Sequence, residues 1–136
     1  MHSNGVISFL GNDTQANMGG LCCNGRDMEN YTGSFYQYMI APLWTDIINI
    51  PKDLDGDGIN DTGFYVEGDS DSQKYFWRNI SEYYNNQTNN TFGVELKDDG
   101  QIDMYHYEVD IRNHNVFTGI IGSGTSELEQ EYFGYG

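Results

Sequence analysis

The sequence predicts a mainly β fold: an antiparallel β-sandwich-like single domain with long loops. Aromatic residues make up 15% of the 136 residues and include 11 tyrosines, a composition typical of strands. Short apolar runs are separated by clusters of Gly, Asn and Asp, as strands are separated by turns. The length is sufficient for one domain with its own core.

The first part of the chain predicts two strands on either side of a long loop. The apolar run Gly5–Leu10 predicts a short strand, and the Gly- and Asn-rich residues 11–34 predict the loop. Residues 36–48 are apolar but contain Pro42. We expect Pro42 to interrupt the strand, because proline donates no hydrogen bond to a sheet.

The rest of the chain carries the clearest strand signals. Residues 74–80 are ambiguous, because their apolar positions fit a helical period as well as a strand. The apolar alternation changes phase near Met104–Tyr105, which predicts a β-bulge there. The predicted strands span residues 63–67, 92–96, 102–111 and 116–121.

The C-terminal segment alternates charged with apolar residues and has no visible partner strand within the chain. We therefore expect a β domain over residues 1–124, with an acidic insert at 51–62, followed by an extended tail at 125–136.

The charge of the chain excludes two kinds of partner. Six basic residues against 21 acidic ones give a formal net charge of −15, which repels nucleic acids and anionic membranes. No apolar run is long enough to predict membrane insertion. Residues 1–4 lack the pattern of a signal peptide, so we expect a mature piece or one domain of a longer chain.

Six Asn-X-Ser/Thr sequences indicate a secreted, extracellular glycoprotein that carries N-linked glycans. Such glycans are bulky and solubilising, and they require their loops to face outward. The predicted acceptors are Asn12, Asn30, Asn60, Asn79, Asn86 and Asn89. Asn79 is the weakest of these predictions, because it lies among aromatic residues.

The two cysteines, Cys22 and Cys23, are adjacent. Their Cα atoms lie about 3.8 Å apart across a trans peptide, which is closer than an unstrained disulfide allows. Two interpretations stay open: a strained vicinal disulfide, or separate bridges to another chain or to a missing segment. Free thiols are disfavoured outside the cell.

Five short motifs resemble, in order, those of the NIDO (nidogen-like) extracellular domain. They are Ser3–Phe9, Ile40–Asp46, Trp77–Ile80 with Tyr83–Tyr84, Asn90–Leu96 with Asp99–Gly100, and Val116–Gly122. The resemblance implies a β-rich module of matrix, tectorin-like or mucin-like proteins, a strand at 74–80, and no enzymatic activity. The chain departs from the family pattern at the short segment 68–72, the acidic insert, the cysteines and the tail.

The acidic insert predicts a Ca²⁺ site. Calcium takes six to eight hard oxygen ligands, and Asp residues at alternate positions of a Gly-containing loop can supply several. The predicted ligands are the side chains of Asp53, Asp55, Asp57 and Asp61, with the backbone carbonyl of Ile59. Phe64 occupies the last position of an EF-hand loop, so the insert more closely resembles thrombospondin-type or dockerin-type loops. Asp46 or Glu67 could complete the shell, and the competing interpretation is a plain acidic turn.

The other chemically interesting residues favour structural roles. Asp98–Asp99 is typical of a turn, and His106 and His114 lack a nucleophile partner. Residues 122–124 lack the surroundings of a nucleophile elbow. Trp44 and Trp77 could stack on sugars, but core packing is the better interpretation.

These observations leave two function classes. The first is a non-enzymatic domain that builds an extracellular fibre or matrix by association with copies of itself or with other matrix proteins. The second is a calcium-dependent adhesion or carbohydrate-binding module. The sequons, the cysteines and the extended tail favour the first class, whereas surface aromatics beside the calcium loop would favour the second.

Overall fold

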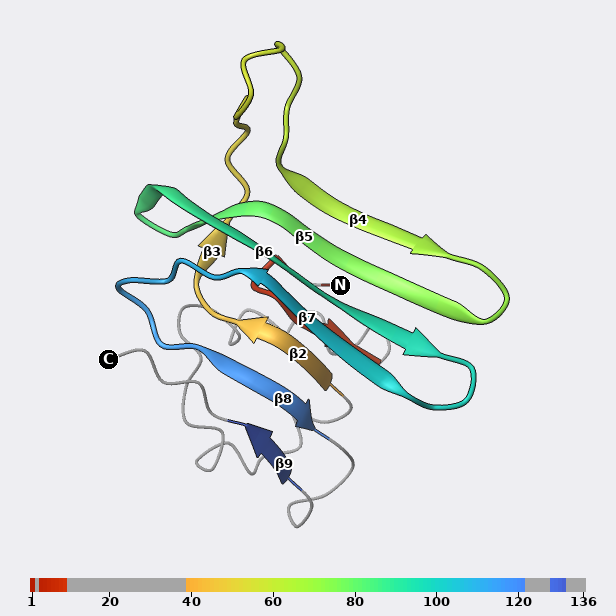
Figure 1. The fold of residues 1–136 in the computed structure, drawn as a ribbon. Coiled ribbons are helices and arrows are strands. Elements are labelled where there is room, and N and C mark those ends of the chain that lie inside the picture. Colours follow the sequence, from red (N-terminus) through yellow and green to blue (C-terminus); the bar gives the residue numbers. More distant parts are fainter. Residues whose placement is uncertain (2, 10–38, 122–127, 132–136) are drawn as a thin grey trace. The chain divides into compact units, whose positions relative to one another are not determined.

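In the computed structural model the described residues are 1, 3–9, 39–121 and 128–131. Their nine strands form two antiparallel sheets (Figure 1), and this part of the chain contains no helix. The predicted mainly β, sandwich-like fold is therefore confirmed. Within the same residues no helical segment has the length and hydropathy needed to span a membrane. The strands belong to two compact units, residues 1–46 with 113–136 and residues 47–112, which are described in turn.

The first unit contains a four-stranded sheet in the order β1-β2-β8-β9. Its strands are β1 (Ile7–Ser8), β2 (Met39–Trp44), β8 (Phe117–Ile121) and β9 (Leu128–Glu131). Every residue of β2 is buried. Pro42 lies inside β2, where the register with β8 shifts between Ala41 and Trp44. Proline is tolerated at such an irregularity, and the Thr118 hydroxyl donates a 2.9 Å hydrogen bond to the Pro42 carbonyl.

The C-terminal tail contributes a strand to this sheet. Residues 128–131 pair with β8 in an antiparallel register, so the expectation that the tail has no partner in the chain is wrong for this segment. The sequence hid the partner because Leu-Glu-Gln-Glu has little apolar pattern with which to predict a strand or its neighbour.

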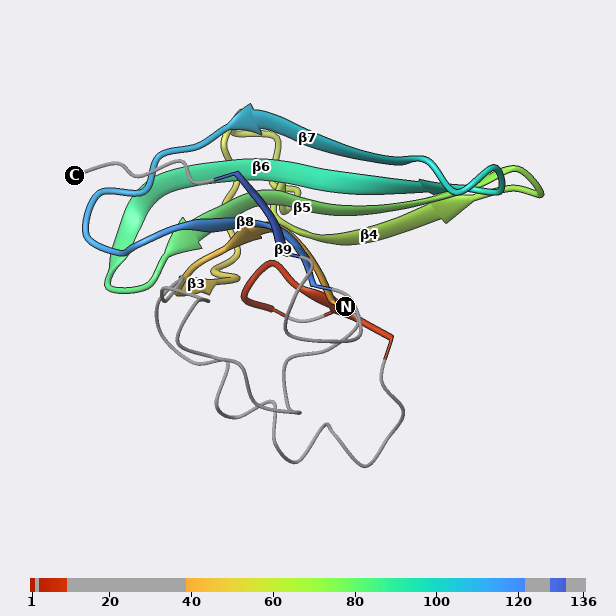
Figure 2. The ribbon, with the colours of Figure 1, turned by 90° about the horizontal axis from the view of Figure 1, so that it is seen from below.

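The second unit contains a five-stranded sheet. Its strands are β3 (Ile47–Ile48), β4 (Gly63–Gly68), β5 (Ser72–Glu82), β6 (Asn85–Lys97) and β7 (Ile102–Glu108). The path is β3-β5-β6-β7, and β4 also pairs with β5. The long strands β5 and β6 curve along their length (Figure 2). Residues 74–80, ambiguous in the sequence, lie within β5.

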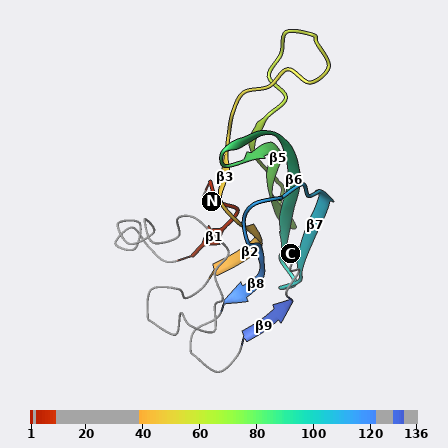
Figure 3. The same cartoon turned by 90° about the vertical axis from the view of Figure 1, so that its left-hand side faces the viewer.

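One edge of β5 is covered by two strands in succession. β3 pairs with Ser81 and Glu82, and β4 pairs with the segment from Gln73 to Arg78. Residues 49–62 connect the two strands as a loop that extends beyond the sheet (Figure 3). The predicted acidic insert is therefore an excursion from an edge of the sheet.

The bulge predicted near Met104–Tyr105 is present in β7, but it lies further along the strand. Met104 and Tyr105 pair regularly with Val94 and Gly93, and the extra residue is Tyr107. The change of phase arises because both faces of β7 carry apolar or aromatic side chains. Met104 belongs to the face of the buried Val94, and Tyr105 belongs to the opposite face.

The two tryptophans belong to the core, as predicted. Trp77 and Phe92 are fully buried, and their rings stack with centroids 5.0 Å apart. Trp44 in the first unit is also buried and meets the Phe117 ring edge-on at 6.2 Å. Neither indole is therefore available to a sugar.

Candidate calcium loop and aromatic surface

The loop between β3 and β4 is closed at its neck by hydrogen bonds. The Asp61 N–H donates to the Lys52 carbonyl at 2.7 Å, and the Lys52 N–H donates to Asn60 Oδ1 at 3.0 Å. Lys52 Nζ reaches β6, where it donates to the Thr88 carbonyl at 2.6 Å and to Asn89 Oδ1 at 2.8 Å. Burial lowers the pKa of Lys52, while the Glu108 carboxylate opposes this shift. The neck is thus fixed to the sheet.

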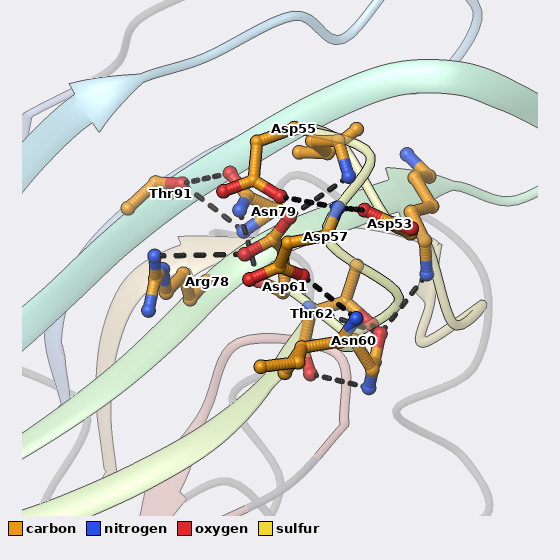
Figure 4. A network of polar contacts seen from close by, with 12 residues as sticks. Asp53, Asp55, Asp57, Asn60, Asp61, Thr62, Arg78, Asn79 and Thr91 are labelled. Atoms are coloured by element: carbon orange, nitrogen blue, oxygen red, sulfur yellow. Dashed lines mark hydrogen bonds and ion pairs between the residues drawn. The ribbon is translucent and has the colours of Figure 1, made fainter.

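Three of the four predicted aspartates converge within the loop. Asp53, Asp55 and Asp61 each place a carboxylate oxygen within 4.8 Å of the others (Figure 4). Oxygens that share one Ca²⁺ lie at most about 5 Å apart, because each is about 2.3–2.6 Å from the ion. The spacing therefore fits calcium, and the three carboxylates would otherwise repel one another.

Backbone N–H groups orient Asp53 within this cluster. Asp53 Oδ1 accepts from Gly56 at 2.7 Å and from Asp57 at 3.1 Å, and Asp53 Oδ2 accepts from Gly58 at 2.8 Å. Gly56 and Gly58 have φ values of +83° and +85°, which favour glycine. The sequence predicted the turn at Gly58, and the reason for it is this wrapping of the backbone around Asp53.

Asp57 lies outside the convergent triad. Its Oδ1 accepts a 2.7 Å hydrogen bond from the Ile59 N–H, which forms a local turn. The Ile59 side chain is exposed. Asp57 therefore shapes the loop, and only its remaining lone pairs could ligate a cation.

Asp61 joins the triad to the sheet. Its Oδ2 accepts from the Leu54 N–H at 2.8 Å, and its Oδ1 lies 4.0 Å from a guanidinium nitrogen of Arg78. Asn79 donates through Nδ2 to the Asp61 carbonyl at 2.9 Å, and Asn79 Oδ1 accepts from the Thr91 hydroxyl at 3.2 Å. Sequence reasoning missed these anchors, because Arg78 and Asn79 meet the loop only through the register of β4 on β5.

The other proposed ligands are not members of the triad. Glu67 is an exposed residue of β4 and is not part of the triad. Asp46 belongs to the first unit, where its carboxylate lies 3.9 Å from His114 Nε2. His106 is exposed on β7. Asp99 accepts from the Gln101 N–H at 2.9 Å, as predicted for a turn.

The predicted glycan acceptors differ in their surroundings. Asn86 is exposed in the β5–β6 hairpin. The amide nitrogens of Asn60 and Asn79 donate hydrogen bonds to the carbonyls of Thr62 and Asp61. Outside the described residues lie Asn12, Asn30, Cys22, Cys23 and residues 122–124.

A second feature is a group of aromatic rings on the face of the sheet opposite Trp77. This aromatic surface consists of Phe76, Tyr105 and Tyr107, whose ring centroids lie 6.0–6.3 Å apart. Phe76 and Tyr105 pair with Gly93 from either side. An added Cβ at Gly93 would lie 2.5 Å from Phe76 Cδ1, so the ring fills the space that glycine leaves open.

Two ion pairs lie beside the aromatic surface, and within each pair the two charges neutralise each other. Lys74 Nζ lies 3.6 Å from Glu95, and Lys97 Nζ lies 2.6 Å from Asp103. The Tyr105 hydroxyl donates to Glu95 Oε2 at 2.7 Å, which raises the pKa of Tyr105 to about 12 and lowers the pKa of Glu95. Lys74 and Phe76 come from β5, whereas the other members belong to the β6–β7 hairpin, so the complete group depends on the pairing of β5 with β6.

In comparisons with known proteins, no family model, no curated protein and no solved structure matches the chain.

Proposed function

We propose that the loop binds Ca²⁺ and that the ion holds the excursion between β3 and β4 in one conformation. The observation that supports this is the convergence of Asp53, Asp55 and Asp61 to within 4.8 Å. The sequence-predicted set adds Asp57 and the Ile59 carbonyl, with water completing the shell. Because the loop interrupts the edge of the sheet, fixing it also fixes the start of β4.

Calorimetric titration and thermal unfolding at matched ionic strength test the calcium site. A ligand that binds only the folded state stabilises it by about 2.7 kcal/mol at 100 times Kd. We expect that Asp53→Asn and Asp61→Asn remove the stabilisation by Ca²⁺. Asp98→Asn is the matched control for Asp53→Asn, because both remove an exposed charge and Asp98 lies in a different turn. Identical unfolding of the wild type in calcium and in chelator would contradict the proposal.

We propose further that the chain is a non-enzymatic domain of a secreted glycoprotein, which builds an extracellular fibre or matrix by association between subunits. Support comes from the six sequons, the charge of −15 and the resemblance to NIDO domains, which stays a prediction. Copies of the chain, or other matrix proteins, are the proposed partners. Nucleic acids and membrane insertion are not part of the proposal.

Sedimentation velocity on the chain purified from its native source tests this function, with negative-stain microscopy as the second measurement. Calcium-loaded protein should form assemblies that grow with concentration. A monomer at every concentration, under oxidising conditions with calcium present, would contradict subunit association.

The aromatic surface favours a second candidate, a calcium-dependent carbohydrate-binding module. Phe76, Tyr105 and Tyr107 lie on the sheet to which Asp61 is anchored through Arg78. Aromatic faces bind the apolar faces of sugars, and the paired charges around them suit a neutral, hydroxyl-rich ligand better than a polyanion.

NMR titration with neutral oligosaccharides tests this candidate. We expect Tyr107→Ala to abolish the shifts that sugar causes in the wild type. Tyr84→Ala is the control, because Tyr84 is 91% exposed at a hairpin tip outside the aromatic surface. A wild type whose spectrum is unchanged by any neutral glycan contradicts the candidate.

A further inference from the structure

β4 has an open edge. All six of its residues pair with β5, and no strand among the described residues pairs with its other side (Figure 1). An edge of this kind presents a row of backbone N–H and C=O groups that can pair with another chain.

The three side chains at the centre of β4 do not block such pairing. Phe64, Tyr65 and Val66 are 41%, 38% and 55% exposed, so apolar and aromatic surface faces solvent on both sides of the strand. Proteins usually protect an edge with charged side chains, Pro, a bulge or a very short strand. The one charge on β4 is Glu67 near its end, and the strand contains no lysine, proline or register shift.

The other edges of the two sheets carry such protection. β7 has an extra residue at Tyr107, and its Asp103 is paired with Lys97. β1 and β3 have two residues each, and β9 reads Leu-Glu-Gln-Glu. β4 is therefore the one edge of the described chain that is long, regular and apolar.

We propose that β4 pairs in an antiparallel register with β4 of a second copy of this chain. A two-fold axis relates the copies and passes between their two Tyr65 residues. In this register Phe64 lies opposite Val66 of the second copy, and the reverse contact repeats by symmetry. Tyr65 lies opposite its own equivalent, and Gly63 lies opposite Glu67. Cross-strand apolar and aromatic pairs stabilise a sheet, and no like charges within the strand are opposed.

This inference rests on the proposed association of subunits and specifies the surface that carries it. We favour an identical strand as the partner of β4, because each exposed apolar or aromatic residue of β4 then lies opposite another apolar or aromatic residue. The two five-stranded sheets would become one continuous sheet across the joint.

Analytical ultracentrifugation of the full chain in calcium tests the surface. We expect Val66→Lys to weaken dimerisation at least tenfold, because it places a charge in the joint. Tyr84→Lys, which introduces the same charge at a more exposed position on a hairpin tip away from β4, should leave dimerisation unchanged. Thermal unfolding of each variant checks that the monomer remains folded.

A cysteine cross-link tests the register. In a Cys22→Ser, Cys23→Ser background, Tyr65→Cys should form an intermolecular disulfide, because directly opposed Cα atoms lie about 4.5–5.5 Å apart. Glu67→Cys should not, because residue 67 would lie about four positions from its equivalent, well over 10 Å away.

The outcomes separate this inference from the function on which it rests. A wild type that stays monomeric overturns both. Association that survives Val66→Lys leaves the proposed function standing and overturns the role of β4. Association that Val66→Lys abolishes, without a cross-link through residue 65, overturns the pairing of β4 with itself and indicates a different strand as the occupant.

Discussion

Tyr105 and Glu95 form the best-defined polar contact on the aromatic surface. The hydroxyl donates at 2.7 Å to a carboxylate that also has Lys74 beside it. Each partner's pKa moves in the direction that preserves the contact: the phenol's rises to about 12 and the carboxyl's falls. The contact therefore stabilises the fold between the acid range, where Glu95 is protonated, and the alkaline range, where Tyr105 ionises.

The phenol of Tyr105 is expected to ionise about two pH units above an ordinary tyrosine, whose pKa is about 10. Because the folded-state pKa is raised, the stabilisation is complete below pH 10 and is lost as the pH rises towards 12. The difference between the ultraviolet pH titrations of the wild type and of Tyr105→Phe isolates this phenol. Glu95→Gln should lower its midpoint towards 10, and an unchanged midpoint would show that Glu95 is not the cause.

Glycan occupancy should differ between two described sequons. Asn86 is exposed, whereas the Asn79 amide is committed to Asp61 and Thr91 on a residue with φ of +53°. A glycan would replace one of the two N–H groups on Asn79 Nδ2, the atom that anchors the loop. Glycopeptide mass spectrometry of native material should find Asn86 modified and Asn79 unmodified, and the reverse result would contradict the anchoring role of Asn79.

At the scale of elements, the sequence predicts strands well where their signals are local. The alternation of Phe92, Val94 and Leu96 and the turn that follows define the β6–β7 hairpin, because both its strands and its turn lie within one short segment. The sequence also predicted Asp53, Asp55 and Asp61 as members of one cluster, and the hydrogen bond from Asp61 to Lys52 at the neck of the loop returns Asp61 to the other two.

Features that depend on which strands pair, and in which register, were not predictable. The partner of β9 is β8, and the anchors of the acidic loop are Lys52 and Asn79, which bond to β6 and to the Asp61 carbonyl. The bulge was misplaced because aromatic residues on the outer face of β7 imitated a change of phase. Each of these features can be predicted only when the register between strands is known. The packing of the folded chain sets that register, and a local motif does not show it.

Gly93 is the position at which this register becomes testable. A Cβ there would lie 2.5 Å from Phe76 Cδ1 and 2.6 Å from the Tyr75 carbonyl oxygen. Gly93→Ala should therefore lower the free energy of unfolding by about 1–3 kcal/mol, as overpacking does. In a double-mutant cycle, Phe76→Ala should relieve part of this loss, because only the ring and not the carbonyl is removed. Strictly additive effects would contradict the contact.

At the scale of the whole molecule, the charge of −15 opposes association between copies. An apolar strand edge supplies attraction only at short range, whereas the repulsion acts over a distance that depends on ionic strength. Exposed charges are screened beyond about 30 Å at 0.01 M salt and beyond about 8 Å at 0.15 M. Screening by salt and neutralisation by calcium should therefore have separable effects on assembly.

We expect association to strengthen as sodium chloride is raised from low to physiological concentration, because repulsion is screened while the β4 joint is unaffected. Calcium at constant ionic strength should strengthen it further: the two-fold register, continued past the strand ends, brings Asp61 of one copy towards Asp69 of the other. Asp61→Asn should remove part of this calcium effect and leave the effect of sodium chloride intact. Sedimentation equilibrium measures the dimer constant under each condition. A dimer that dissociates as salt rises would instead be held by opposite charges, and its joint could not be the uncharged centre of β4.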